Sequence, residues 1–359
     1  MGLFSKKPFI GLDMGHYSIK AVQAERHSNG WRLTRLMEVP TPKDAIKDGV
    51  VVDVHAVSYA IKDLIAENKL QIGGVHLGVA GGSVMVRNVR IPKMSEATLR
   101  KSIKFEASRY VPTTAEESFI EFEIAGHSED NQMDVIVVAA PKELVSSRIQ
   151  VIEALGLEVE SVDIEVFAGY RSLIEADPSQ DWVSSTFCLV DIGSISSKLS
   201  VIQQGAFVMT RSIPGGGSVL TEALKNYFKL SDADAESGKA QLDVSVLTDS
   251  TAPIENPPLR VIQPHLDDLI REVRRSLNYH QSQLAEPNSA NQVSYVLLTG
   301  GGARMPGLAR YVEHKLGIKT LTAGVFNNPR FTHSTARSDG GSEMSVAVGL
   351  AMRSYSKAA

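Results

Sequence analysis

The alternation of apolar and polar residues after Phe187 predicts a β-hairpin with a charged residue just before its turn. An apolar run extends to Ile192 and is interrupted only by Asp191. Gly193 and small hydroxylated residues follow, and an alternating strand begins at Lys198. Gly and Ser favour tight turns, so the carboxylate would lie at the end of the incoming strand. Backbone N–H groups of such a turn can point into one concavity, which suits phosphate oxygens.

The same pattern occurs near the N-terminus, about half the chain earlier. The corresponding residues are Asp13, Gly15, Ser18 and Lys20 in the first copy and Asp191, Gly193, Ser196 and Lys198 in the second. In both copies a third strand follows and ends on proline, at Pro40 and at Pro214. Two such hairpins indicate an internal duplication, and therefore a fold built from two related α/β halves.

The segment between the two hairpins has its own order of elements. A helix is expected over 56–68 and a short apolar strand over 75–80. Residues 84–162 are predicted as strand, helix, two strands, helix and strand, which is the order of the split βαβ arrangement. Its strands are expected at 84–91, 119–124, 134–140 and 158–162. A helix over 164–176 then leads to the second hairpin.

The part of the chain after the second hairpin alternates between helices, one buried strand and polar loops. The strand is expected at 293–299, and the loops at 243–259 and 322–341. Helices are expected after Ser218 as far as Phe228, from Ser231 onward, and over 260–284, 306–316 and 343–355. The predicted domains are a first half at 1–83 plus 163–186, an inserted subdomain at 84–162, and a second half at 187–359.

Composition excludes several classes of protein. Of the 359 residues, 43% are hydrophobic and 22% charged, as in ordinary globular proteins, and a net charge of −4 gives no general affinity for nucleic acid. The single Cys188 excludes an internal disulfide framework and fits a reducing compartment. No apolar run is long enough to span a membrane, and there is no signal peptide. The tail with Leu3, Phe4, Lys6 and Lys7 is expected to fray and to offer at most a weak membrane contact.

A third loop of interest follows the predicted strand 293–299. Its three consecutive glycines, 300–302, would let the backbone approach a flat or phosphorylated ligand because they lack a Cβ atom. Asp13 and Asp191 are candidate Mg²⁺ ligands through water, since Mg²⁺ prefers one or two carboxylates together with water and phosphate. Two phosphate loops and one base-side loop would then face each other across a cleft between duplicated halves.

These motifs resemble those of the actin-like ATPase superfamily, with phosphate motifs at 10–20 and 189–201 and an adenosine motif at 298–308. The resemblance implies an α/β actin-like ATPase fold of duplicated RNase H-like domains that binds ATP and Mg²⁺. An Ala-Glu-x-x-Lys element implies Glu236 at the ribose hydroxyls and Lys239 near the base. The expected nucleotide-binding residues are Asp13, Gly15, His16, Tyr17, Ser18, Lys20, Asp191, Gly193, Ser194, Ser196, Lys198, Gly215, Gly216, Gly217, Glu236, Lys239, Gly300, Gly301, Gly302 and Arg304.

The insertion at 84–162 resembles the βαββαβ subdomain of FtsA-type proteins. Segments 4–13, 211–217 and 274–279, together with the chain length, resemble the PilM family of type IV pilus assembly proteins. This resemblance implies a cytoplasmic protein at the inner membrane that docks the N-terminal cytoplasmic tail of PilN beside the insertion. It also implies contacts with other pilus platform proteins and self-association, with membrane contact only through partners.

Hydrolysis of ATP needs a group that orients the attacking water, and no residue identifies itself as that group in the sequence. We therefore expect nucleotide binding with slow or absent turnover. Two alternatives stay open. One is an FtsA-type filament-forming division protein, for which we would expect a terminal membrane helix. The other is a small-molecule kinase of the same fold, although the insertion offers no evident polar sugar pocket.

Overall fold

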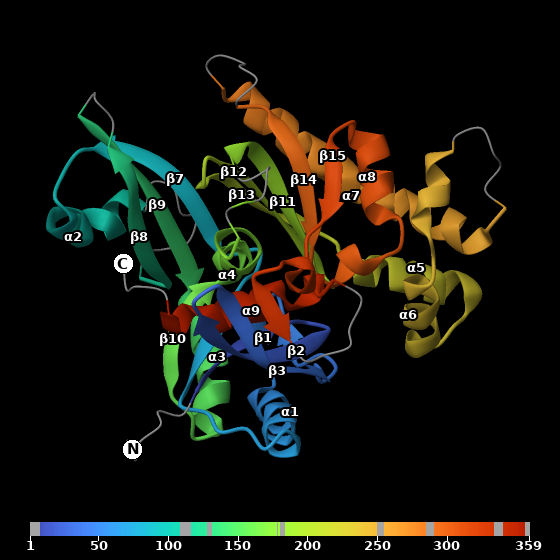
Figure 1. Cartoon of the computed structure of the whole chain (residues 1–359), viewed down its shortest axis with the longest axis horizontal. Coiled ribbons are helices and arrows are strands. Elements are labelled where there is room, and N and C mark those ends of the chain that lie inside the picture. The colour runs from blue at the N-terminus through green and yellow to red at the C-terminus, as the bar shows by residue number, and fades with distance from the viewer. Residues whose placement is uncertain are drawn as a thin grey trace.

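The computed structural model describes residues 8–107, 116–127, 131–177, 179, 184–249, 255–284, 291–333 and 340–355. The predicted N-terminal membrane contact falls on residues 1–7 and lies outside this set. The described chain forms two large sheets and a smaller three-stranded sheet that projects from one side (Figure 1). A two-stranded hairpin, β4 (Ile46–Lys47) and β5 (Val50–Val51), completes the strands.

The first large sheet contains the first predicted hairpin. Its strands, in spatial order, are β10 (Val159–Ile164), β6 (Gly74–Val79), β1 (Phe9–Met14), β2 (Ser18–His27), β3 (Gly30–Pro40) and β16 (Phe331–His333). Strands β1, β2 and β3 form an antiparallel meander, whereas β6 runs parallel to β1 and β10 runs parallel to β6. The predicted three-strand meander is therefore confirmed.

The second large sheet repeats this topology. Its order is β13 (Ala206–Pro214), β12 (Ser196–Gln203), β11 (Thr186–Ile192), β14 (Val293–Thr299) and β15 (Lys319–Thr322). Again an antiparallel meander is extended by two parallel strands. Within the two hairpins, Asp13 pairs with Lys20 across the strands and Asp191 pairs with Lys198. The internal duplication is therefore confirmed, and the equivalent Asp and Lys residues of the two hairpins are paired in the same way.

Helices cover the sheets where apolar residues recur every three or four positions. The longest, α7 (Pro257–Ser282), begins after Asn256, whose side chain accepts a hydrogen bond from the N–H of Leu259. Its buried Leu259, Ile262, Leu266, Ile270 and Val273 join Val296 and Leu298 of β14 in one core. The other helices are α1 (Val54–Glu67), α2 (Glu96–Ala107), α3 (Lys142–Ala154), α4 (Glu165–Tyr170), a π-helical turn at Arg171–Glu175, α5 (Gly217–Phe228), α6 (Asp232–Ala240), α8 (Leu308–Leu316) and α9 (Ser345–Met352).

The inserted segment has the predicted order of elements, but its last two elements belong elsewhere. Strands β7 (Met85–Pro92), β9 (Gln132–Pro141) and β8 (Ser118–His127) form a separate sheet in that spatial order, packed against α2. Helix α3 instead packs Val151 and Ile152 into the core of the first half, and β10 joins the first large sheet beside β6. The independent sheet of the insertion thus ends at Pro141.

The C-terminal part of the chain returns to the first half, although 187–359 was predicted to form the second. Strand β16 pairs with β3, and every residue of α9 is buried. Glycines permit this contact: a Cβ on Gly349 would lie 1.8 Å from the carbonyl oxygen of Ala168, and one on Gly11 would lie 2.2 Å from the backbone nitrogen of Ala351. The assignment of this segment to the second half is therefore corrected.

Both predicted polar loops contain structure within the described ranges. Val244–Thr248 forms a 3₁₀ turn that buries Val244 and Leu247, and α7 begins two residues before 259. Residues 322–341 include a second 3₁₀ turn, Val325–Asn327, as well as β16. Sequence analysis predicts these short apolar stretches as loops, because the residues that bury them lie far away in the sequence. The closing helix is flanked by 3₁₀ turns at Ser342–Met344 and Arg353–Tyr355.

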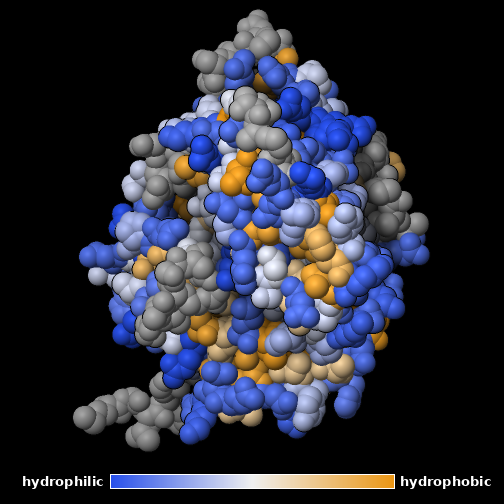
Figure 2. Space-filling view, turned by 90° about the vertical axis from the view of Figure 1, so that its right-hand side faces the viewer, coloured by the Kyte–Doolittle hydropathy of each residue, from blue (hydrophilic) through white to orange (hydrophobic). Residues whose placement is uncertain are grey.

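The face of the molecule that carries α5 and α6 is largely hydrophilic. Figure 2 shows this side, on which hydrophobic side chains form small groups between hydrophilic ones. Within the described segments, no helix combines the length and the apolar content needed to cross a lipid bilayer.

Candidate nucleotide site

The two hairpin turns are built alike. The N–H of Gly15 donates to the carbonyl of Ser18 at 3.2 Å, and the N–H of Gly193 donates to that of Ser196, also at 3.2 Å. Each turn follows a strand whose second-last residue is an aspartate, Asp13 in β1 and Asp191 in β11. The structure therefore places both predicted phosphate loops in the same local geometry, at equivalent ends of equivalent sheets.

The two lysines of the hairpins differ in what they contact. Lys20 Nζ lies 3.6 Å from Asp13 Oδ2, as an ion pair across the strands. Lys198 Nζ instead donates to Ser212 Oγ at 2.7 Å and to Ser196 Oγ at 3.3 Å. One carboxylate is thus paired with its own lysine, whereas the lysine of the other hairpin is turned toward β13.

The negative charge of Asp13 acts on Asp191 in the other hairpin. The pKa of Asp191 is raised to about 6, first by burial and then by the negative charge of Asp13, while Lys20 and Lys198 oppose the shift. Two carboxylates that repel each other favour a divalent cation between them. The pair therefore fits the prediction of Mg²⁺ held through water and phosphate oxygens. In the described part of the chain, no three His, Cys, Asp or Glu side chains gather closely enough to hold a metal ion.

A third carboxyl group, that of Glu165 at the start of α4, lies within range of the charges of Asp13 and Asp191 and was missed by sequence analysis. Its side chain is 17% exposed. Burial raises its pKa to about 7, with the charges of Asp13 and Asp191 adding to the shift and those of Arg148 and Lys198 opposing it. A single acidic residue at a helix start is a common stabilising feature, so nothing in its sequence neighbourhood marked it.

His16, in the first turn, also faces this cluster. Burial lowers its pKa, as do the positive charges of Arg148 and Lys198, whereas Asp48 and Asp13 raise it. Its Nε2 atom is buried and has no hydrogen-bond partner among the described residues. Ser18, at the far side of the turn, donates instead to Glu38 Oε1 at 2.7 Å.

The glycines at 300–302 divide into two structural kinds. Gly300 has φ +84°, and a Cβ there would lie 2.1 Å from Asp191 Oδ1. A Cβ on Gly302 would lie 2.3 Å from Ile192 Cγ2. These two glycines let the loop pack tightly on the second hairpin. Only around Gly301 would a Cβ meet nothing within 4 Å, so this residue is the one that borders open space.

The glycines at 215–217 clamp the second turn. The N–H of Gly217 donates to the carbonyl of Gly193 at 2.9 Å, and Ser218 donates to the carbonyl of Ser194 from both its N–H and its hydroxyl. A Cβ on Gly216 would lie 2.3 Å from the Gly193 carbonyl oxygen. Gly215, at φ +94°, supplies the bend. The start of α5 is thereby fixed against the second phosphate loop.

Glu236 and Lys239 meet on α6, as predicted. Lys239 Nζ donates to Glu236 Oε2 at 2.7 Å, to Thr221 Oγ1 at 2.9 Å and to the carbonyl of Gly217 at 3.2 Å. Thr221 in turn donates to Glu236 Oε2 at 2.6 Å. This cluster joins α6 to the start of α5, next to the glycines that clamp the second turn.

Tyr17 connects the first turn to the opposite half. Its pKa is raised, first by burial and then by the negative charges of Glu236 and Glu38, while Arg304 lowers it. Tyr17 is 59% exposed, and the charges of Glu236 on α6 and of Arg304 in the loop after β14 act on it across the intervening space. Arg304 itself lies 3.9 Å from Glu343 Oε2. The structure thus brings residues of both hairpins, α6 and the third loop around one space.

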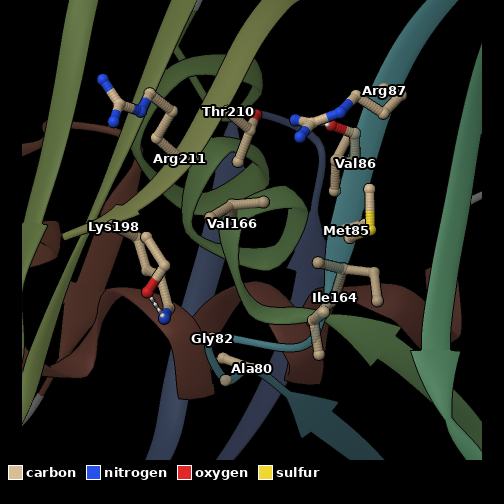
Figure 3. A pocket seen from close by; sticks show the side chains of 13 residues that line it. Ala80, Gly82, Met85, Val86, Arg87, Ile164, Val166, Lys198, Thr210 and Arg211 are labelled. Carbon is tan, nitrogen blue, oxygen red and sulfur yellow. Dashed lines mark hydrogen bonds between the residues drawn. The ribbon is translucent and has the colours of Figure 1, made fainter. Parts of the chain in front are cut away.

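A cavity of about 220 Å³ adjoins this space beside the insertion (Figure 3). Lys198 lines it from β12, Val166 from α4, and Met85 from β7. Arg87 extends across it from β7 toward Thr210 on β13. Strand β7 is an edge strand of the inserted sheet and β13 an edge strand of the second large sheet. The cavity therefore lies between two sheet edges.

Two equivalent α/β halves, each with an Asp-Gly hairpin facing the other, define the actin-like ATPase fold. The structure of MreB5 of Spiroplasma citri bound to AMPPNP matches with TM-score 0.54 and 14% identity, covering 99% of this chain and 97% of that one. Cell division protein FtsA of Pseudomonas aeruginosa is 23% identical, over 91% of this chain and 88% of its own length. FtsA of Streptococcus pneumoniae is 22% identical, over 92% and 79%.

Within this fold, the chain belongs to the family of type IV pilus assembly protein PilM, whose model matches residues 11–355. A solved structure of the PilM–PilN type IV pilus biogenesis complex matches with TM-score 0.84 and 24% identity, covering 98% of this chain and 100% of that one. The predicted family and the FtsA-like relationship are confirmed.

Proposed function

We propose that this chain binds Mg²⁺-ATP between its two halves and docks the N-terminal cytoplasmic tail of PilN at the inner-membrane platform of the type IV pilus. The observation that carries the nucleotide proposal is the convergence of Asp13 and Asp191 at the ends of two equivalent hairpins. Two neighbouring carboxylates repel each other, and a bound cation relieves this repulsion. The adjacent turns supply backbone N–H donors for phosphate oxygens.

The other parts of the site support ATP as the ligand. MreB5, which shares the fold, has been solved with ADP and with AMPPNP. In this chain Glu236 would accept from the ribose hydroxyls, Lys239 would lie near the base, and Gly301 would leave room for the adenosine. Asp13 and Asp191 would hold Mg²⁺ through water, and Lys20 and Lys198 would balance the phosphate charge.

Glu165 is our candidate for the group that orients water near the phosphates. It lies beside both aspartates, and a carboxyl group with a pKa of about 7 changes its protonation state near neutral pH. A bound cation would favour its ionised form, which can accept a proton from water. We keep the expectation of slow turnover, so the primary role is binding.

For PilN, the cavity between β7 and β13 is the docking site that we favour. An extended peptide can add to a sheet edge through backbone hydrogen bonds while one of its side chains fills a neighbouring pocket. Met85, Ile164 and Val166 give this pocket apolar walls that suit an apolar side chain. A protein related to this chain forms a complex with PilN, which supplies the partner.

The experiment is calorimetric titration with a synthetic peptide that copies the cytoplasmic tail of PilN from the same source, with and without Mg²⁺-ATP. We expect saturable binding that Met85→Glu weakens by at least tenfold, because the new charge would be buried in the pocket. Leu321→Glu adds the same charge at the far edge of the second sheet, on β15, and should leave binding unchanged.

Absence of peptide binding, with Mg²⁺-ATP binding confirmed, would contradict the docking proposal and leave the nucleotide site standing. In that case the relationship to FtsA makes filament formation the next candidate. Sedimentation of the protein that depends on ATP would then support the filament.

A further inference from the structure

The inserted sheet is attached to the first half through two chain crossings that lie side by side. The entering crossing runs from β6 through residues 80–84 into β7. The leaving crossing runs from β9 directly into α3, with Pro141 as the last residue of the strand. Because β9 is the central strand of the inserted sheet, α3 continues the most internal element of the insertion.

Both crossings contact the turn between β4 and β5 closely, although residues 80–84 also border the cavity on their other side. A Cβ on Gly49, at φ +88°, would lie 2.4 Å from the carbonyl oxygen of Ala80 and 3.1 Å from Leu144 Cδ1. A Cβ on Gly81 would lie 3.0 Å from the carbonyl oxygen of Asp48. Close-packed contacts such as those of Gly49 and Gly81 transmit displacements between the segments that they join. We call this region the root of the insertion.

One side chain, Arg148, connects the elements of the root. It lies on α3 and is only 2% exposed. Its Nη1 donates to the carbonyl of Gly78 on β6 at 2.9 Å, and its Nε donates to the carbonyl of Gly49 at 3.2 Å. The guanidinium therefore joins the leaving helix, the entering strand and the turn between them.

The same guanidinium reaches the nucleotide site. Arg148 Nη1 lies 3.7 Å from Glu165 Oε1, and its charge also acts on His16 in the first phosphate loop. A buried charge costs free energy, and two carbonyl bonds alone could be made by a neutral donor. The ionic contact with Glu165 gives the charge a partner that lies beside Asp13 and Asp191.

We propose that Arg148 is a positioning residue that couples the orientation of the inserted subdomain to the nucleotide site. Nucleotide and Mg²⁺ change the charge around Glu165, which shifts the guanidinium and, through α3, the central strand of the insertion. A ligand on the insertion acts in the reverse direction on nucleotide affinity, since coupling between two sites is reciprocal. This inference rests on the proposed binding of Mg²⁺-ATP.

The test is hydrogen exchange of the full chain with and without Mg²⁺-ATP, read at the amides of β9 and α3. In the wild-type protein we expect nucleotide to slow exchange there by about fivefold or more, the lower range of typical coupling between sites. Arg148→Met keeps the apolar stem but removes the charge and the donors. It should still bind Mg²⁺-ATP, and the change in β9 and α3 should be lost.

Arg90→Met is the matched control. Arg90 lies on β7 of the insertion, is 59% exposed and pairs with Asp134 at 3.0 Å, so its loss should leave the exchange response intact. If Arg148→Met does not fold, Glu165→Gln serves instead, because it removes the ionic contact and leaves both carbonyl bonds of Arg148 in place. It too should abolish the response.

The results separate the inference from the proposed function. A wild-type protein that binds Mg²⁺-ATP without any change in β9 and α3 would overturn the inference alone. So would a full response in Arg148→Met or in Glu165→Gln. Failure of the wild-type protein to bind Mg²⁺-ATP would overturn the proposed function and this inference with it.

Discussion

Asp13 and Asp191 are the second-last residues of equivalent strands of the two halves, yet only Asp13 forms an ion pair with the lysine across its own hairpin. Lys20 Nζ lies 3.6 Å from Asp13 Oδ2, whereas Lys198 Nζ donates to Ser212 and Ser196. The two hairpins have equivalent strand registers, but their lysines contact different groups. The site therefore holds one carboxylate in an ion pair, that of Asp13, and a second, that of Asp191. The pKa of Asp191 is about 6 because burial and the charge of Asp13 raise it.

Asp191→Asn should stabilise the protein in the absence of ligand and abolish its stabilisation by Mg²⁺-ATP. A carboxyl group with a raised pKa in the folded state favours folding below its unfolded value near 4, and this contribution is lost as the pH rises through about 6. At pH 8 the charged Asp191 therefore opposes folding. We expect a gain of about 1–3 kcal/mol from the neutral amide.

Thermal unfolding at pH 8, with and without Mg²⁺-ATP, measures both effects. In the wild-type protein the ligand should raise the midpoint by mass action. An Asp134→Asn variant, which changes an aspartate on the inserted sheet, should behave as wild type. A ligand shift that persists in Asp191→Asn would contradict the assignment of Asp191 to the site.

Gly302→Ala and Gly301→Ala should have different effects although they lie side by side. The new methyl at 302 would overlap Ile192 Cγ2, so we expect a loss of about 1–3 kcal/mol in the free energy of unfolding. The methyl at 301 enters open space and should leave stability nearly unchanged while weakening Mg²⁺-ATP binding. Denaturant unfolding and nucleotide titration of both variants check this, and equal stability of the two would count against the packing argument.

Lys239→Met should weaken Mg²⁺-ATP by about tenfold, because a charge-assisted hydrogen bond is worth on the order of 1.5–3 kcal/mol. The lysine orders Glu236, Thr221 and the start of α5. Lys225→Met is the control, since Lys225 lies on α5 and pairs with Asp232 and Glu222 at the surface. Fluorescence titration with a nucleotide analogue gives both affinities; equal losses in the two variants would contradict a specific role for Lys239.

His76 should make the fold sensitive to acid. It is buried between Ser161 and Ser354, and burial, with the charge of Arg353, lowers its pKa to about 4. A lowered pKa contributes stability above the unfolded value near 6.5, and this is lost as the pH falls toward 4. The loss is at most about 3 kcal/mol. His76→Gln should flatten the dependence of unfolding free energy on pH between 7 and 4.5, and an unchanged slope would exclude His76 as its source.

The parts of the fold that sequence predicts well are those that neighbouring residues determine. The hairpins of Asp13 and Asp191 combine a period-two pattern with Gly and Ser at the turn, and the structure confirms both hairpins. The α6 cluster of Glu236 and Lys239 depends on spacing along one helix, so it too could be predicted.

What sequence could not supply depends on contacts between distant segments. The sequence at 158–162 is compatible both with a strand of the inserted sheet and with a strand paired to β6. In the structure it pairs with β6, and α3, which precedes it, packs in the first half. Glu165 resembles an ordinary helix start until the fold brings Asp13 and Asp191 beside it. The packing of Gly300 and Gly302 against the second hairpin likewise depends on Asp191 and Ile192, which lie far away in the sequence.

Helix α9, packed on β1 and α4, has a consequence for how the protein is made. Strand β1 is synthesised well before α9, so the core of the first half cannot close until α9 has been made. Until then, the surface of β1 and α4 that α9 covers stays accessible to chaperones. A fragment that ends between the two halves would lack α9. The first half would therefore not fold completely on its own.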